Sequence, residues 1–123
     1  MGKEEREGGH IGTHQGVRIA DYSALLVFAK TTEAQVIGKQ LLRSGTSTGA
    51  QVREGNRSRS GAEMISKTEG ALQELQETIY WLELLGDADI VKTERLADVL
   101  KEADELTAIL VTSVKTLKAR RAK

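Results

Sequence analysis

The side chains best suited to binding chemistry are basic, and they lie between residues 39 and 59. On a helix, at about 100° per residue, four of them share one narrow arc and a fifth follows in the next loop. They are Lys39, Arg43, Arg53, Arg57 and Arg59. Arginine binds phosphate through paired hydrogen bonds, so this arc is a candidate nucleic-acid-binding surface. An alternative of equal weight is that these cations form ion pairs within or between subunits.

Aromatic residues that could stack on bases are missing beside this arc in the sequence. We therefore predict binding that tolerates any base sequence and weakens as salt is added. The sequence does not discriminate between RNA and DNA.

Residues for catalysis or metal binding are scarce. The chain has no cysteine, and its two histidines, His10 and His14, lie among glycines. Their spacing is that of a helical metal pair, but the glycines disfavour a helix and no third ligand is near. Di-iron bundles need Glu-x-x-His pairs that face inward, and no histidine follows His14. We therefore predict no enzymatic activity, no cofactor and no metal.

A helix over residues 33–57 must carry the basic arc. Its opposite arc holds a set of apolar and small residues that we expect to be buried: Ile37, Leu41, Ser44, Thr48, Val52 and Gly55. Gly38, Gly45 and Gly49 lie on one flank, and each costs about 1 kcal/mol relative to alanine in a helix. We interpret these glycines as positions where the absence of a side chain lets a neighbouring backbone approach closely. The alternative is a flexible or ligand-facing segment.

The remaining elements are also helical. The chain of 123 residues has no proline and is rich in helix-forming residues, so we predict an all-α protein. Helices are expected over residues 19–31, 33–57, 61–85 and 93–120, joined by short loops. This arrangement predicts an antiparallel up-down-up-down four-helix bundle over residues 18–123. Residues 1–17 are expected to form a disordered glycine-rich tail.

Helix ends follow from capping signals. We expect Thr32 with Gln35, and Ser60 with Glu63, to form capping boxes. Gly86 is a natural stop for the helix over residues 61–85, and Thr93 is the expected N-cap of the last helix. The expected core residues of these two helices are Ile65, Leu72, Leu75, Ile79 and Leu82, then Leu96, Leu100, Ala103, Leu106, Leu110, Val114 and Leu117.

Two surfaces suggest assembly. Trp81 and Leu84 point away from the predicted core, and with Gly45 and Gly49 they are candidates for a subunit interface. The alternative is that the predicted first helix or the tail covers Trp81 and Leu84. Charge is also segregated along the sequence. Residues 36–67 contain six basic and two acidic residues, and residues 68–90 contain six acidic residues and no basic one. Such surfaces can mate head to tail between subunits and close into a ring, or pair within one chain.

Net charge is zero, which gives no argument of its own for nucleic acid. Four cations near the end of the chain, Lys115, Lys118, Arg120 and Arg121, fit the helix macrodipole; contact with nucleic acid is the second interpretation. No stretch approaches 18 apolar residues and no apolar signal core is present, so we expect a soluble cytoplasmic protein with no membrane contact.

The segment from residue 36 to 85 contains the pieces KQLLRSGTS, GAQVRE, ISK and YWLELL. It resembles the bacterial four-helix-bundle family named for proteins encoded in 23S rRNA intervening sequences, a family that includes the accessory variability proteins of diversity-generating retroelements. The resemblance implies a bundle that assembles as a homopentameric ring. In the retroelement branch it also implies a positively charged surface that binds nucleic acid and a reverse transcriptase as partner.

The sequence therefore predicts a non-enzymatic oligomer that binds nucleic acid through the basic arc, as an accessory factor to a reverse transcriptase in one branch of the family. The alternative is a structural or scaffold oligomer whose partner is a protein.

Overall fold

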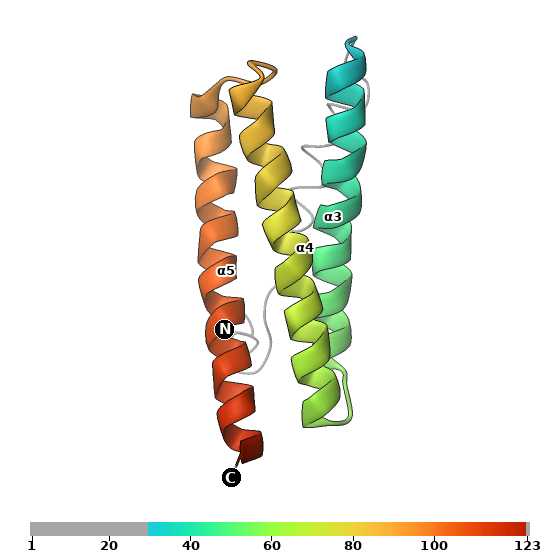
Figure 1. Ribbon diagram of the computed structural model, residues 1–123, viewed down its shortest axis with the longest axis vertical. Helices are drawn as coiled ribbons and strands as arrows, with labels where there is room; N and C mark the ends of the chain where they lie inside the picture. Colours follow the sequence, from blue (N-terminus) through green and yellow to red (C-terminus); the bar gives the residue numbers. More distant parts are fainter. Residues whose placement is uncertain (1–29, 123) are drawn as a thin grey trace, which may run out of the picture.

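The computed structural model describes residues 30–122. This part of the chain consists of three α-helices and contains no strand: α3 (Thr32–Asn56), α4 (Gly61–Asp87) and α5 (Thr93–Ala122). Successive helices run antiparallel, and α4 lies between α3 and α5 (Figure 1). The prediction of an all-α protein is confirmed for the described residues. The predicted tail over residues 1–17 and the predicted helix over residues 19–31 lie outside them.

The helix starts follow side-chain capping. Ser60 is the N-cap of α4, and its hydroxyl accepts a hydrogen bond from Glu63 N at 3.1 Å, which confirms that predicted cap. The cap of α3 is Thr31, whose side chain accepts from Ala34 N at 3.3 Å. The prediction of Thr32 is therefore wrong by one residue, because either of two adjacent threonines can supply the hydroxyl. The last helix begins with Thr93 as its first residue, and the Thr93 hydroxyl donates to Glu94 Oε1 at 3.4 Å. The prediction of Thr93 as N-cap is therefore wrong by one residue.

Gly86 does not stop α4, which continues to Asp87. The residue in the left-handed conformation is Asp89, with φ of 58°, a conformation that Asp tolerates better than most residues. Gly86 serves packing instead. A Cβ built there would lie 3.2 Å from Thr93 Cγ2 and 3.3 Å from Leu96 Cδ1, so the missing side chain lets α5 approach α4.

Two apolar clusters form the core, and α4 contributes to both. The upper cluster of Figure 1 comprises Ile37, Leu41, Leu82, Leu85, Leu96 and Val99. The lower cluster comprises Val52, Ala71, Leu75, Ala103, Leu106 and Leu110. Full burial of each leucine contributes about 2 to 3 kcal/mol. All six residues predicted for the inner arc of α3 are buried, so that prediction is confirmed.

The predicted core of α4 needs correction. Leu75 and Leu82 are buried, but Ile65, Leu72 and Ile79 are only half-buried. Thr68, Ala71 and Thr78 are buried in addition. A middle helix with a neighbour on two sides encloses small residues where the helices meet, and a search for the largest apolar residues passes over them. In α5, Leu100 and Leu117 are half-buried and Val99 is buried.

The buried hydroxyl groups of α3 and α4 all have partners. Thr78 Oγ1 donates across the helix interface to Ser44 Oγ at 2.9 Å. Thr48 Oγ1 donates to Ser44 O at 2.8 Å, and Thr68 Oγ1 to Met64 O at 2.7 Å. Unpaired buried hydroxyls would cost about 1 to 3 kcal/mol each, so these pairs allow polar side chains in the core. Across residues 30–122, no helix has the length and apolar character that crossing a membrane requires.

Candidate nucleic-acid interface

The basic arc of α3 is continuous. The helix runs without a break through Gly45 and Gly49, and Lys39, Arg43 and Arg53 are all exposed on it. Arg57 is exposed at the C-cap of α3, and Arg59 is exposed in the loop that follows. The structure thus places all five of these basic residues on the surface.

Arg43 differs from the other four cations because it is paired within the chain. Its Nη1 lies 3.3 Å from Glu74 Oε1, and its Nη2 bonds Glu77 Oε2. The hydrogen bond to Glu77 raises the pKa of Arg43. Within the described residues, Lys39, Arg53, Arg57 and Arg59 form no ion pair. The alternative of intrachain pairing therefore holds for Arg43 and not for the others.

Glu77 joins the arc to an aromatic residue. Trp81 Nε1 donates to Glu77 Oε2 at 3.0 Å, the oxygen that Arg43 also contacts. Trp81 packs against the core, so the lack of aromatic partners for base stacking beside the arc stays a prediction. The register of α4 against α3 brings Arg43 to Glu77, whereas Glu77 and Trp81 are one turn apart on α4. Hydrogen bonds from Trp81 and from Arg43 lower the pKa of Glu77.

The lowered pKa of Glu77 predicts a pH-dependent contribution to stability. A carboxylate with a depressed pKa stabilises the fold above its unfolded value of 4.5, and this stabilisation disappears as pH falls through the folded pKa. We expect Glu77→Gln to lower the urea midpoint slightly at pH 7 and by less at pH 3.

The matched control for Glu77→Gln is Glu83→Gln, on the same helix, where the described residues show no ion pair. Urea unfolding followed by Trp81 fluorescence at both pH values measures the difference. An equal loss at pH 3 and pH 7 would show that Glu77 acts through packing and not through its charge.

Trp81 and Leu84 are less outward than their positions in the sequence suggest. Both are half-buried and pack against the cluster of Ile37 and Leu82. The exposed aromatic residue is Tyr80, which is 55% exposed and meets Trp81 edge to face at 5.0 Å between ring centroids. Reasoning from the sequence missed Tyr80, although its place next to Trp81 and away from the apolar stripe could have indicated it.

The glycine flank has mixed roles. Gly38 and Gly45 are buried, but a Cβ built on Gly49 meets no atom of the described residues within 4 Å. Among those residues, the explanation by close backbone approach is therefore wrong for Gly49. A Cβ at Gly55 would make ordinary contacts with Lys67 Cβ at 3.4 Å and Thr68 Oγ1 at 3.5 Å.

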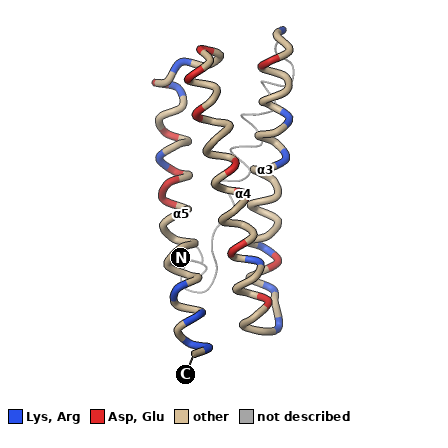
Figure 2. Tube along the Cα trace, in the orientation of Figure 1, with Lys and Arg blue, Asp and Glu red and all other residues tan. Residues whose placement is uncertain are grey.

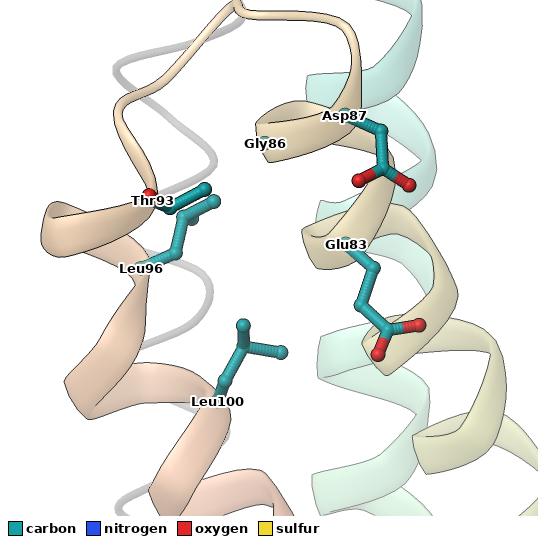
Figure 3. Close-up of a pocket in the computed structure, with 6 residues that line it drawn as sticks. All are labelled: Glu83, Gly86, Asp87, Thr93, Leu96 and Leu100. Carbon is teal, nitrogen blue, oxygen red and sulfur yellow. The ribbon is translucent and has the colours of Figure 1, made fainter.

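A pocket of about 340 Å³ lies between the end of α4 and the start of α5. Figure 3 shows Leu96 and Leu100 directed toward α4, whereas the carboxylates of Glu83 and Asp87 turn away from them. Polar groups do not converge on the pocket. In the described part of the chain, no three His, Cys, Asp or Glu residues are grouped as a metal site requires. The two histidines lie outside that part.

The described residues define a class: a small helical protein in which one helix, α3, displays exposed basic side chains along one side. The sequence matches the model of the 23S rRNA-intervening sequence protein family over residues 17–112, and the chain belongs to this family. This confirms the resemblance to that family, whereas the relation to the accessory variability proteins of retroelements stays a prediction.

Solved structures support the same fold. A crystal structure of a protein of unknown function from the S23 ribosomal protein family of Bacteroides thetaiotaomicron VPI-5482 is similar, with a TM-score of 0.72 and 33% sequence identity. The alignment covers 84% of this chain and 94% of that one. The comparison with curated proteins found no match.

Proposed function

We propose that this chain is a non-enzymatic oligomer that binds nucleic acid through the exposed face of α3. One observation carries the proposal: Lys39, Arg53 and Arg57 lie exposed along one side of an unbroken helix and form no ion pair within the described residues. Cations held without a carboxylate partner remain available to a phosphate.

The contacts favour the phosphate backbone over the bases. Arginine offers paired donors to phosphate oxygens. The described aromatic residues, Tyr80 and Trp81, lie in the last turns of α4, whereas Arg53 and Arg57 lie at the end of α3, where α4 begins. Binding should therefore tolerate any base sequence and weaken steeply with salt, because it releases counterions.

Fluorescence anisotropy tests this proposal on the full chain. Labelled RNA and DNA of one sequence, single- and double-stranded, are titrated at several salt concentrations from about 50 mM upward. We expect affinity to fall linearly with salt on logarithmic axes. Absence of binding to every probe at the lowest salt would remove the proposed function.

The finer assignments rest on the family resemblance. We propose a four-helix bundle over residues 18–123, with a predicted helix over residues 19–31 joining the three described ones, and a homopentameric ring. An accessory role beside a reverse transcriptase follows for the retroelement branch. Co-purification with a reverse transcriptase encoded beside this chain would support that role, and a ribosomal RNA gene as the only neighbour would count against it.

The alternative function is a scaffold oligomer that binds a protein. Tyr80 and Val36 are more than half exposed, and apolar side chains of this size on a surface favour a partner. Trp81 is a poor probe of assembly, since it packs against the core, so Tyr80→Glu is the cleaner substitution.

Gly49 gives a direct test of assembly. Nothing in residues 30–122 fills the space beside it, so Gly49→Ala should stabilise an isolated subunit by about 0.5 to 1 kcal/mol. If Gly49 lies in the subunit interface, as proposed, the same methyl group will weaken the oligomer. We expect a lower mass by light scattering at micromolar concentration for Gly49→Ala and no change for Thr112→Ala on the exposed face of α5. Unchanged mass for both would place Gly49 outside the interface.

A further inference from the structure

Basic residues gather at one end of the described bundle. There α3 ends, α4 begins and α5 ends, and Figure 2 shows basic positions on all of these segments. We call this surface the basic end. It comprises Arg53, Arg57, Arg59, Lys67, Lys115, Lys118, Arg120 and Arg121.

Ion pairs neutralise only part of the basic end. Lys67 Nζ lies 2.8 Å from Glu54 Oε1, and Lys118 Nζ lies 2.9 Å from Glu69 Oε2. The other basic residues form no ion pair within the described residues, and all of them are exposed. Glu63 is the one remaining carboxylate among residues 53–69. The surface therefore keeps a large positive excess.

One contact joins the two halves of the basic end. A Cβ built on Gly61 would lie 3.5 Å from both Cδ and Nη1 of Arg121, so the end of α5 packs beside the first residue of α4. Arg59 precedes Gly61 by two residues and Arg120 precedes Arg121 by one. The cations of the loop and of α5 therefore share one surface, although they are more than 50 positions apart in the sequence.

The opposite end of the bundle is acidic. Asp87 is the last residue of α4, Asp89 lies in the following loop, and Glu94 and Asp98 lie in the first two turns of α5. Lys92 and Arg95 offset only part of this negative charge. Lys39 and Arg43 lie on the half of α3 nearer to this end, and Arg43 is balanced by Glu74 and Glu77. Charge is thus unevenly distributed in a chain of zero net charge, and a polyanion is attracted more strongly to the basic end.

We propose that the basic end, including the last turn of α5, is the surface that docks the phosphate backbone of a nucleic-acid duplex. The proposal rests on the proposed function. It places the main binding surface at one end of the bundle and not along the whole length of α3. A duplex fits because it presents about one phosphate charge per 1.7 Å of helix axis, and because the basic end has no described aromatic side chain on which unpaired bases could stack.

A pair of matched variants tests the location. Arg120→Gln/Arg121→Gln removes two charges from the basic end, and Lys92→Gln/Arg95→Gln removes two from the start of the same helix. Binding of a labelled 20-base-pair duplex is measured by anisotropy over a salt series, and circular dichroism checks that helix content is retained. We expect the affinity of the first variant for the duplex to fall about tenfold, and its slope of log affinity against log salt to become shallower by about 2. The affinity of the control should change less than about twofold.

The outcomes separate this inference from the proposed function. If wild type binds and Arg120→Gln/Arg121→Gln binds equally well while Lys39→Gln weakens binding, the location is overturned and the function stands. If wild type binds the single strand more tightly than the duplex, the choice of duplex is overturned. If wild type binds no probe at low salt, both the location and the proposed function fail.

Discussion

Replacing Arg53 and Arg57 together by glutamate is expected to weaken nucleic-acid binding at least a hundredfold near 100 mM salt. Both side chains are exposed and without an ion pair among the described residues. Each lost phosphate contact removes about 0.9 from the slope of affinity against salt on logarithmic axes. Reversal of sign then adds repulsion between carboxylate and phosphate, which makes the loss larger than neutralisation alone would give.

The control for this variant is Lys92→Glu/Arg95→Glu, which changes the net charge by the same amount at the other end of the bundle. Glutamate in the last turn of α3 is also unfavourable to the helix dipole, so thermal unfolding must show that both variants are folded at the assay temperature. Equal affinity losses in the two variants would mean that binding follows total charge, and the assignment of α3 would then be abandoned.

The second large effect concerns stability. Leu75→Ala is expected to lower the free energy of unfolding by about 3 kcal/mol, within the range of about 2 to 5 kcal/mol for buried leucines. Leu75 is fully buried in the cluster that joins Val52 of α3 to Leu106 and Leu110 of α5. A cavity there loosens both interfaces of α4 at once, because the two outer helices pack mainly on α4.

Leu42→Ala makes the same chemical change at a position that is 37% exposed, and we expect it to cost less than about 1 kcal/mol. Urea unfolding followed by circular dichroism measures both variants. If Leu75→Ala cost no more than Leu42→Ala, α4 would not be the central helix of the packed core.

The sequence predicted α3 well because its pattern is strong. Most apolar residues lie on one side and the basic residues on the other over seven turns, although Val36 and Leu42 are exposed. The periodicity alone therefore assigns Ile37 to the core and Arg53 to the surface. The cap at Ser60 was equally clear, since its partner Glu63 stands at the required spacing.

The sequence predicted contacts between helices poorly. Nothing in a single helix reveals that Arg43 meets Glu74 and Glu77, or that Arg121 reaches Gly61. Such contacts depend on the axial register of antiparallel neighbours, which no local signal encodes. The burial of Thr78 in place of Ile79 has the same origin, because it depends on where α3 touches α4.

The hydrogen bond between Ser44 and Thr78 has a mechanical consequence. If α3 slid along α4 by one turn, about 5.4 Å, the two hydroxyls would lose each other and keep only their intrahelical partners, Glu74 O for Thr78 and Leu41 O for Ser44. The loss of one buried hydrogen bond costs about 0.5 to 1.5 kcal/mol. The pair therefore opposes sliding of α3 along α4. Any adjustment of this bundle to a bound molecule should be a tilt of whole helices about this contact, without a shift along their axes.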